Sequence, residues 1–244
     1  VLDLIEYIAN AFHLKPGDNY HYRLSLGDRK DEKKYFKDDN SWQQAEDTLR
    51  KVLSSRHVPF VEAEGEAAFY GPKIDIQMKN VNGKEDTAFT VQYDFVMPKR
   101  FQLVFTNEKG EEEQPIVIHR SSIGAIERVM AFLIEHYAGA FPTWLAPVQM
   151  TLLPIADRHH EFAEKIKKQL QNIGIRVEND TRSERLQAKI RDATLQKVPF
   201  MGIIGDKEIE NESISVRKRS GEDLGSLVLS SLTERLKEDI DKKI

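Results

Sequence analysis

The chain has 244 residues, no cysteine, 40% hydrophobic residues and a formal net charge of −4 at pH 7. These values are typical of a globular protein and exclude disulfides and any zinc site built from thiolates. No apolar run of about 18 residues is present, so we expect no membrane span and a cytoplasmic protein. Neither half is strongly basic, so any contact with RNA should be local. The chain begins at Val1 without a signal-peptide pattern or an initiator Met, so we expect a fragment or a processed chain.

Apolar spacing in the first half indicates helices packed on one side of an antiparallel sheet. Period-three-to-four spacing predicts a helix over 1–14, and Ser41 with Gln44 resembles a capping box at the start of a second helix. The apolar face of that second helix is predicted to consist of Trp42, Ala45, Leu49, Val52 and Leu53. Period-two alternation predicts strands at 20–26, 73–78, 89–95, 101–106 and 116–119.

Turn signals separate these elements. Asn82-Gly83 predicts that strands 73–78 and 89–95 form an antiparallel hairpin. The charged segment 27–39 is predicted to be an exposed loop, and the polar segment 107–110 to be a turn between the last two strands.

The segment 116–130 joins an apolar strand to an amphipathic helix and places polar groups at the junction. Gly124 and Ala125 keep the first helical turn thin enough for a flat ligand to approach closely, and Arg128 projects one turn further on. The alternative is an ordinary strand-to-helix corner with a surface Arg. The segment alone does not separate these two interpretations.

From Val148 onward, strands alternate with helices, and two prolines at 142 and 147 mark the expected boundary between domains 1–147 and 148–244. Strand, helix, strand, helix, strand predicts a largely parallel sheet. The predicted strands are 148–155, 175–178, 200–204 and 213–219. The predicted helices are 158–172, 184–196 and, after a Ser230-Ser231 cap, 232–243.

Candidate site residues lie on adjacent predicted strands of the first half. Lys73, Gln92 and His119 could line one face of the sheet, with Tyr70 on the preceding loop and Arg128 on the following helix. Lys and Arg suit phosphate oxygens, Gln and Tyr can orient a small polar substrate, and a neutral His can bind zinc. Taken singly, each residue is more often a solvated or structural side chain. No P-loop, Rossmann fingerprint, zinc-finger pair or nucleophile elbow is present.

Several strings closely resemble threonyl-tRNA synthetase, a class II aminoacyl-tRNA synthetase. In the first half they are Phe69-Tyr70-Gly71-Pro72-Lys73-Ile74, Val91-Gln92-Tyr93-Asp94-Phe95, Ile118-His119-Arg120, Gly124-Ala125-Ile126-Glu127-Arg128 and Phe141 to Gln149. Downstream, the strings at 174–177, 198–201, 205–208 and 223–226 resemble that family's anticodon-binding domain. The likeness covers nearly the whole chain in the family's order.

The resemblance implies the end of an antiparallel α+β catalytic domain followed by an α/β anticodon-binding domain with a mixed sheet. It implies ATP-dependent activation of threonine, with Mg²⁺, and transfer to tRNA(Thr) by an enzyme that is a homodimer. Arg128, Gln92 and Lys73 would be catalytic, and Tyr70, Lys73, Gln92, Gly124 and Ala125 would bind substrate. His119 would be one of three zinc ligands in a site where zinc holds threonine by its amino and hydroxyl groups.

In the second domain the residues that resemble anticodon readers are Ile155, Arg182, Ser183, Glu208 and Arg217. We expect them at strand ends and at a helix N-terminus, where donors can read unstacked bases. The alternative for Glu208 and Arg217 is a surface ion pair across a hairpin.

Three departures from the family's pattern stand out. The family's first two signature motifs and its other two zinc ligands would lie upstream of Val1, so we expect this chain alone to be inactive and to hold no stoichiometric zinc. Thr87-Ala88-Phe89-Thr90 stands where the family has Gln-Cys-Gly-Thr. Ser183 replaces a frequent Asn, and Ala125 replaces a Ser. A non-catalytic RNA-binding paralogue and another class II synthetase therefore remain as alternatives.

Overall fold

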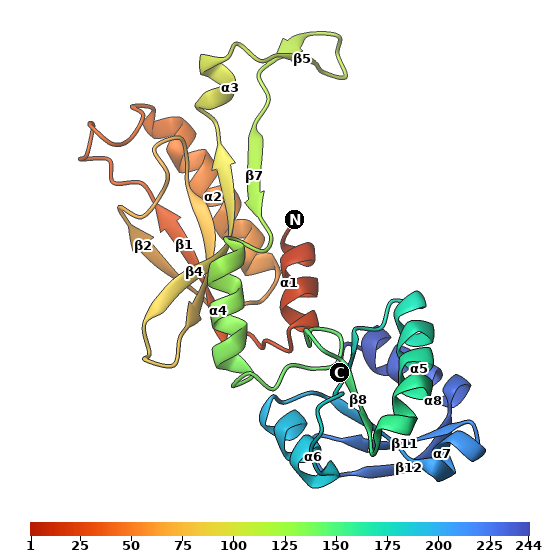
Figure 1. The fold of residues 1–244 in the computed structure, drawn as a ribbon. Helices are drawn as coiled ribbons and strands as arrows, with labels where there is room; N and C mark the ends of the chain where they lie inside the picture. The colour runs from red at the N-terminus through yellow and green to blue at the C-terminus, as the bar shows by residue number, and fades with distance from the viewer. The chain divides into compact units, whose positions relative to one another are not determined.

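The computed structural model describes residues 1–244, which form two compact units, Val1–Glu135 and His136–Ile244. The first unit is built on a five-stranded sheet in the order β2-β1-β3-β4-β7 (Figure 1). Its strands are β1 (Tyr20–Leu26), β2 (Phe60–Glu64), β3 (Lys73–Lys79), β4 (Glu85–Asp94) and β7 (Val117–Ser121). All neighbouring pairs are antiparallel except β1 and β2, which are parallel.

Helices cover one face of this sheet. They are α1 (Leu2–Ala11), α2 (Asp39–Ser55) and α4 (Ile126–His136). Glu6 of α1 accepts a hydrogen bond from the Tyr22 hydroxyl on β1 at 2.9 Å and also pairs with Arg56 at the end of α2. The residues on this face of the central strands are buried and apolar, as alternation requires of a half-covered sheet. They include Tyr22, Leu24, Ile74, Ile76 and Val91.

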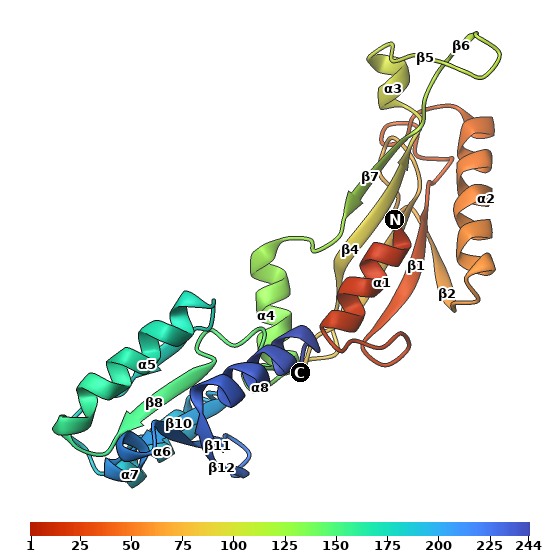
Figure 2. The ribbon, with the colours of Figure 1, turned by 90° about the vertical axis from the view of Figure 1, so that its right-hand side faces the viewer.

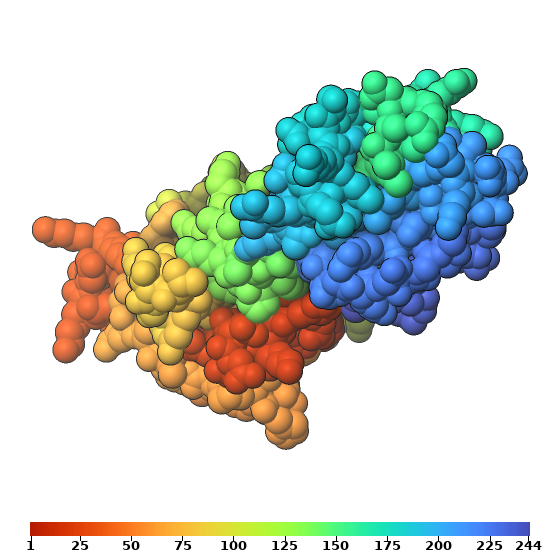
Figure 3. Space-filling view, turned by 60° about the horizontal axis from the view of Figure 1, so that its bottom comes forward, coloured from red at the N-terminus to blue at the C-terminus, as the bar shows by residue number.

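The loop predicted at 27–39 ends at Asp38, because α2 begins at Asp39, and it projects from the first unit in the space-filling view (Figure 3). Gly27 and Tyr35 are buried exceptions within it. The Tyr35 ring is only 6% exposed and packs edge-on against Trp42 at 5.5 Å between centroids. Trp42 is a core residue, as its apolar spacing indicated.

Two predictions for α2 were wrong. Its N-cap is Asp38 rather than Ser41, because the Asp38 carboxylate accepts a hydrogen bond from the Ser41 backbone N–H at 3.1 Å and so occupies the capping position itself. Val52 is 38% exposed, whereas Trp42, Ala45, Leu49 and Leu53 are buried. The apolar stripe is therefore narrower than predicted.

The predicted strand 101–106 is also corrected. Asp94 Oδ1 accepts hydrogen bonds from the backbone N–H groups of Val96 and Met97, which starts the short helix α3 (Met97–Arg100), and Pro98 fits its first turn. Only Phe105–Thr106 (β5) is a strand, and it pairs with Glu112–Glu113 (β6) rather than with β7. The resulting arm projects from the sheet (Figures 1 and 2).

The second unit is a five-stranded mixed sheet in the order β12-β11-β10-β8-β9, with α5 and α8 packed into one core and α6 into another (Figure 2). Its strands are β8 (Met150–Pro154), β9 (Val177–Asn179), β10 (Phe200–Ile204), β11 (Ser213–Lys218) and β12 (Asp223–Val228). Its helices are η1 (Asp157–His159), α5 (His160–Asn172), α6 (Leu186–Leu195), α7 (Asp206–Glu210) and α8 (Leu229–Asp241). β8, β9 and β10 run parallel, as predicted, and β11 and β12 run antiparallel.

The predicted serine cap of the last helix is wrong. α8 begins at Leu229, its N-cap residue is Val228, and Ser230 and Ser231 lie inside the first turn. β2, α7 and β12 were not predicted as separate elements. No helix in the structure has the length and apolar character needed to cross a bilayer.

Candidate active site

The face of the first sheet opposite the helices carries a line of polar side chains. Lys73 on β3 lies opposite Gln92 on β4, and Gln92 lies opposite His119 on β7. Because residues two apart on a strand share a face, Asp75 and Asp94 belong to the same surface. We call this set, Lys73, Asp75, Gln92, Asp94 and His119, the polar face.

Lys73 is held by a buried carboxylate. Asp75 is fully buried and its Oδ2 accepts hydrogen bonds from Lys73 Nζ at 2.7 Å, Arg23 Nη2 at 3.0 Å and the Ser25 hydroxyl at 2.8 Å. The Thr90 hydroxyl donates to Oδ1 at 2.9 Å. Burial by itself would raise the pKa of Asp75, but the hydrogen bond and charge of Lys73, with Ser25 and Arg23, lower it overall.

Tyr70 closes one end of the polar face. Its hydroxyl donates to Gln92 Oε1, and its ring lies 5.3 Å from the His119 ring. Burial, and then the charge of Asp94, raise the pKa of Tyr70, which therefore stays a protonated phenol at neutral pH. Gly71 lets the loop that carries Tyr70 lie close to β4, because a Cβ at this position would lie 1.7 Å from the Tyr93 carbonyl oxygen.

His119 is bound on one side only. Its Nε2 lies 2.8 Å from Oδ2 of Asp94, a carboxylate with no solvent exposure, while the His119 side chain is 46% exposed. Its other nitrogen, Nδ1, has no hydrogen-bond partner in the structure, so it is a candidate ligand for a metal. No group of three or more His, Cys, Asp or Glu side chains in the structure is arranged to hold a metal.

Arg128 lies apart from these residues. Its Nη1 donates to the Thr87 carbonyl oxygen at 2.9 Å, five residues along β4 from Gln92, which is about 17 Å of strand. Gly124 makes this junction possible: its φ is +74° and a Cβ would lie 2.1 Å from the Ala88 carbonyl oxygen. Ala125, beside it, is exposed. Gly124 is therefore needed for close packing of this junction against β4, in addition to any approach of a ligand.

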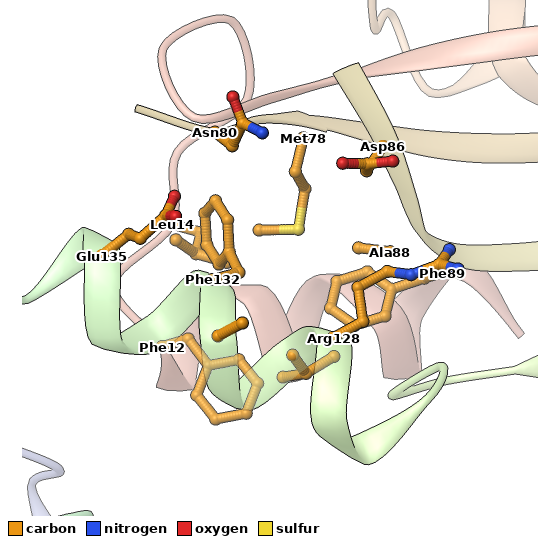
Figure 4. A pocket seen from close by; sticks show the side chains of 12 residues that line it. Phe12, Leu14, Met78, Asn80, Asp86, Ala88, Phe89, Arg128, Phe132 and Glu135 are labelled. Carbon is orange, nitrogen blue, oxygen red and sulfur yellow. The ribbon is translucent and has the colours of Figure 1, made fainter. Parts of the chain in front are cut away.

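A cavity of about 110 Å³ lies beside Arg128, between the α1–β1 turn, the β3–β4 hairpin and α4. Figure 4 shows Met78 from the sheet and Phe132 from α4 inside it, with Asn80, Asp86 and Glu135 at its margin. The cavity is on the helix-covered side of the sheet, because Met78 shares a face with Ile74 and Ile76. The polar face is therefore a separate surface.

The predicted RNA-contacting residues of the second unit gather at one edge of its sheet, with one exception. Ile155 follows β8, Arg182 and Ser183 follow β9, and Glu208 lies on α7 after β10. The carboxyl ends of these parallel strands meet at one edge. Arg217 lies opposite Met201 near the start of β10, away from that edge.

The local contacts of these residues differ from one another. Glu208 Oε2 accepts a hydrogen bond from Gly205 N at 2.9 Å, so it caps α7 and forms no ion pair with Arg217. Arg182 bridges Asp180 and Asp192, and its hydrogen bonds lower the pKa of Asp180. The buried Lys189 ammonium donates to the carbonyl oxygens of Pro154 and Asp180, which ties the strand ends that precede Ile155 and Arg182.

Two protein families match the two parts of the chain. The tRNA synthetase class II core domain (G, H, P, S and T) matches residues 26–137, and the anticodon binding domain matches residues 146–239. A threonine–tRNA ligase of Clostridium botulinum (strain Eklund 17B) is 46% identical over 243 residues, all of this chain and 38% of that protein. The chain belongs to the threonyl-tRNA synthetase family.

Another threonyl-tRNA synthetase, from Halalkalibacterium halodurans, is 44% identical over 99% of this chain and 37% of its own length. The chain thus spans less than two fifths of these relatives. The solved RNA binding domain of threonyl-tRNA synthetase from Cryptosporidium parvum Iowa II superposes with a TM-score of 0.87 at 28% identity, over 97% of this chain and 58% of that one. The predicted fold, part of a class II core followed by an anticodon-binding domain, is confirmed, whereas the division after Pro147 stays a prediction.

Two acidic residues of the polar face were not predicted from the sequence. Asp75 and Asp94 each lie two positions after a residue that was singled out, Lys73 and Gln92. Alternation along a strand places such pairs on one face, and that signal could have found them.

Proposed function

We propose that this chain is the part of a threonine–tRNA ligase that supplies one wall of the amino-acid activation site together with the anticodon-binding domain. The observation that carries the proposal is the polar face, on which a charged Lys73, a Tyr70–Gln92 pair and a half-exposed His119 lie together. The reaction is ATP-dependent formation of threonyl adenylate, with Mg²⁺, followed by transfer to tRNA(Thr). As part of translation it takes place in the cytoplasm.

Each residue of the polar face has a role that its contacts support. The Lys73 ammonium, oriented by Asp75, places positive charge near the phosphate that develops charge during activation. Tyr70 and Gln92 orient the amino acid next to it. Arg128 binds ATP at the other end of β4, where Gly124 and Ala125 leave the backbone accessible.

His119 would provide one ligand to the zinc of the complete enzyme, and the other two would come from outside these residues. A metal that binds both the amino and the hydroxyl group of threonine selects against valine, which has the same shape without the hydroxyl. The single free nitrogen of His119 fits this role. The chain alone is expected to bind no stoichiometric zinc, which metal analysis of the purified chain would test.

In the second unit, Ile155, Arg182, Ser183 and Glu208 would contact anticodon bases at the shared strand edge. Arg217, which lies opposite Met201 and away from that edge, would make a separate contact with the RNA. Unstacked bases are read by such side chains and backbone groups. The partners are tRNA(Thr), threonine and ATP, and the complete enzyme would act as a homodimer.

One observation favours a second candidate, a non-catalytic RNA-binding paralogue. In place of the family's Gln-Cys-Gly, Phe89 is buried at 1% exposure, and the Thr87 hydroxyl accepts a hydrogen bond from Gln77 Nε2 at 2.6 Å. These side chains are used for packing and for the sheet's own hydrogen bonds, so they leave no pocket amide at this position.

Pyrophosphate exchange by the full-length protein decides between the two. We expect exchange with threonine and much less with serine or valine, and a loss of about 10²- to 10³-fold in kcat/KM for Lys73→Met. Lys79→Met is the matched control, because Lys79 lies on the same strand and its side chain is 60% exposed, and it should keep wild-type exchange. No exchange with any amino acid would contradict the ligase and favour the RNA-binding paralogue.

A further inference from the structure

The contacts of Asp94 determine which nitrogen of His119 carries the proton. Asp94 Oδ1 accepts two hydrogen bonds, from Val96 N at 2.9 Å and Met97 N at 2.8 Å. Its Oδ2 lies 2.8 Å from His119 Nε2. A carboxylate offers only acceptors, so in the neutral imidazole the proton must be on Nε2 and the lone pair on Nδ1.

The exposure of the two groups agrees with this arrangement. Asp94 has no solvent exposure, so water does not compete for its Oδ2. The His119 side chain is 46% exposed, and the Tyr70 ring beside it limits its rotation. Carboxylates commonly fix metal-binding histidines in this way, by accepting the proton of the nitrogen that does not bind the metal.

We propose that Asp94 is a positioning residue that holds His119 as the Nε2–H tautomer and so presents Nδ1 as its metal-binding atom. The role in metal binding rests on the proposed function, whereas the tautomer is a property of this chain by itself. Asp94 touches neither substrate nor metal in this proposal. It acts only through His119.

An isosteric substitution separates this role from a purely structural one. In Asp94→Asn the amide oxygen must stay on the side of the Val96 and Met97 N–H groups, because only an oxygen can accept their hydrogen bonds. The amide NH₂ then faces His119 Nε2, which can now only accept. The proton therefore moves to Nδ1, and the lone pair for a metal is lost.

The tautomer can be measured on the 244-residue chain labelled with ¹⁵N-histidine, by long-range ¹H–¹⁵N correlation at a pH well above the ordinary histidine pKa of about 6.5. His119→Gln assigns the signal. We expect Nε2–H in the wild type and Nδ1–H in Asp94→Asn. Nδ1–H in the wild type, or an unchanged tautomer in the variant, would overturn the proposal.

The chain contains its own control for this measurement. His159 Nδ1 accepts a hydrogen bond from the Ala156 backbone N–H at 3.1 Å, which fixes its proton on Nε2 facing Asp206. The His159 signal should show Nε2–H in the wild type and in Asp94→Asn. Retained hydrogen-exchange protection of the Val96 and Met97 N–H groups would show that the cap of α3 is intact.

Chelator competition on the full-length protein tests the consequence for metal binding. We expect zinc affinity to fall about 10- to 100-fold in Asp94→Asn. A tautomer that changes without a change in zinc affinity would overturn the assignment of Nδ1 as the metal-binding atom. A wild-type protein without zinc would instead contradict the zinc role of His119 in the proposed function, and the measured tautomer would still decide whether Asp94 positions the ring.

Discussion

At the scale of single residues, the polar face depends on two buried carboxylates, which form ion pairs and hydrogen bonds with the side chains around them. Asp75 compensates the charges of both Lys73 and Arg23, and Asp94 binds His119 and two backbone N–H groups. A buried charge that loses its partner is destabilising, because the remaining group has neither water nor a counter-charge. These carboxylates therefore couple the stability of the sheet to the geometry of the candidate site.

We expect Asp75→Asn to lower the free energy of unfolding of the first unit by about 2–4 kcal/mol at neutral pH. The cost stays below that of a fully buried pair because the side chains of Lys73 and Arg23 remain 18% and 22% exposed. Denaturation followed by Trp42 fluorescence in a Trp144→Phe background reports on this unit.

The same variant should show a characteristic pH dependence. The folded-state pKa of Asp75 is lowered, so its contribution is fully present above the unfolded pKa of about 3.9 and is lost as pH falls through the folded value. The difference between wild type and Asp75→Asn should therefore shrink in acid. A difference that grows in acid would contradict the assigned ion pairs.

At the scale of the elements, α2 shows how a cap selects the start of a helix. Asp38 and Ser41 both have capping side chains, and the sequence pattern favoured Ser41 because Gln44 follows three residues later. In the structure Ser41 is the residue whose N–H is capped, and its hydroxyl donates to Asp38 Oδ2 at 2.9 Å. The helix therefore begins at Asp39, one turn before the Trp42 contact with the core.

Asp38→Ala should therefore destabilise the first unit by about 0.5–2 kcal/mol, because the N–H of Ser41 loses its acceptor. Ser41→Ala is the matched variant and should cost less, since the backbone hydrogen bond to Asp38 remains. Urea denaturation of the two variants compares them directly. A larger loss of stability in Ser41→Ala than in Asp38→Ala would contradict Asp38 as the N-cap and favour Ser41.

At the scale of the whole molecule, the segment that follows α4 is bound into the second unit. Arg176 donates to the carbonyl oxygens of Trp144 and Ala146, and Arg219 donates to those of Ala140 and Phe141. Burial lowers the pKa of Arg219, yet the pKa stays far above neutrality, so this guanidinium group remains a charged donor.

We expect a fragment of residues 136–244 to fold by itself and to be more stable than one of residues 148–244. The shorter fragment lacks the carbonyl acceptors at 140–146, so Arg176 loses its side-chain acceptors and Arg219 keeps only the Lys197 carbonyl oxygen. Each hydrogen bond of a charged group contributes about 1.5–3 kcal/mol. Thermal unfolding of the two fragments measures the difference. Equal stability would place the domain boundary at Pro147, as the sequence predicted.

The sequence by itself determined much of the local structure. The strands 20–26 and 200–204 were predicted with their observed bounds, because alternation or a buried apolar run coincides there with clear turn signals. The short strings around Tyr70, Gln92 and His119 also identified the family. These signals are local, and a single sequence contains them.

Tertiary structure decided what depends on residues far apart in the chain. It placed Asp75 among Arg23, Lys73 and Thr90, and Asp94 beside His119, pairings that span up to 52 positions in the sequence. It also placed residues 101–106, predicted as a strand of the sheet, in an exposed arm after α3, the short helix whose first N–H groups donate to Asp94. Burial and charge compensation are properties of the packed sheet, and no local pattern specifies them.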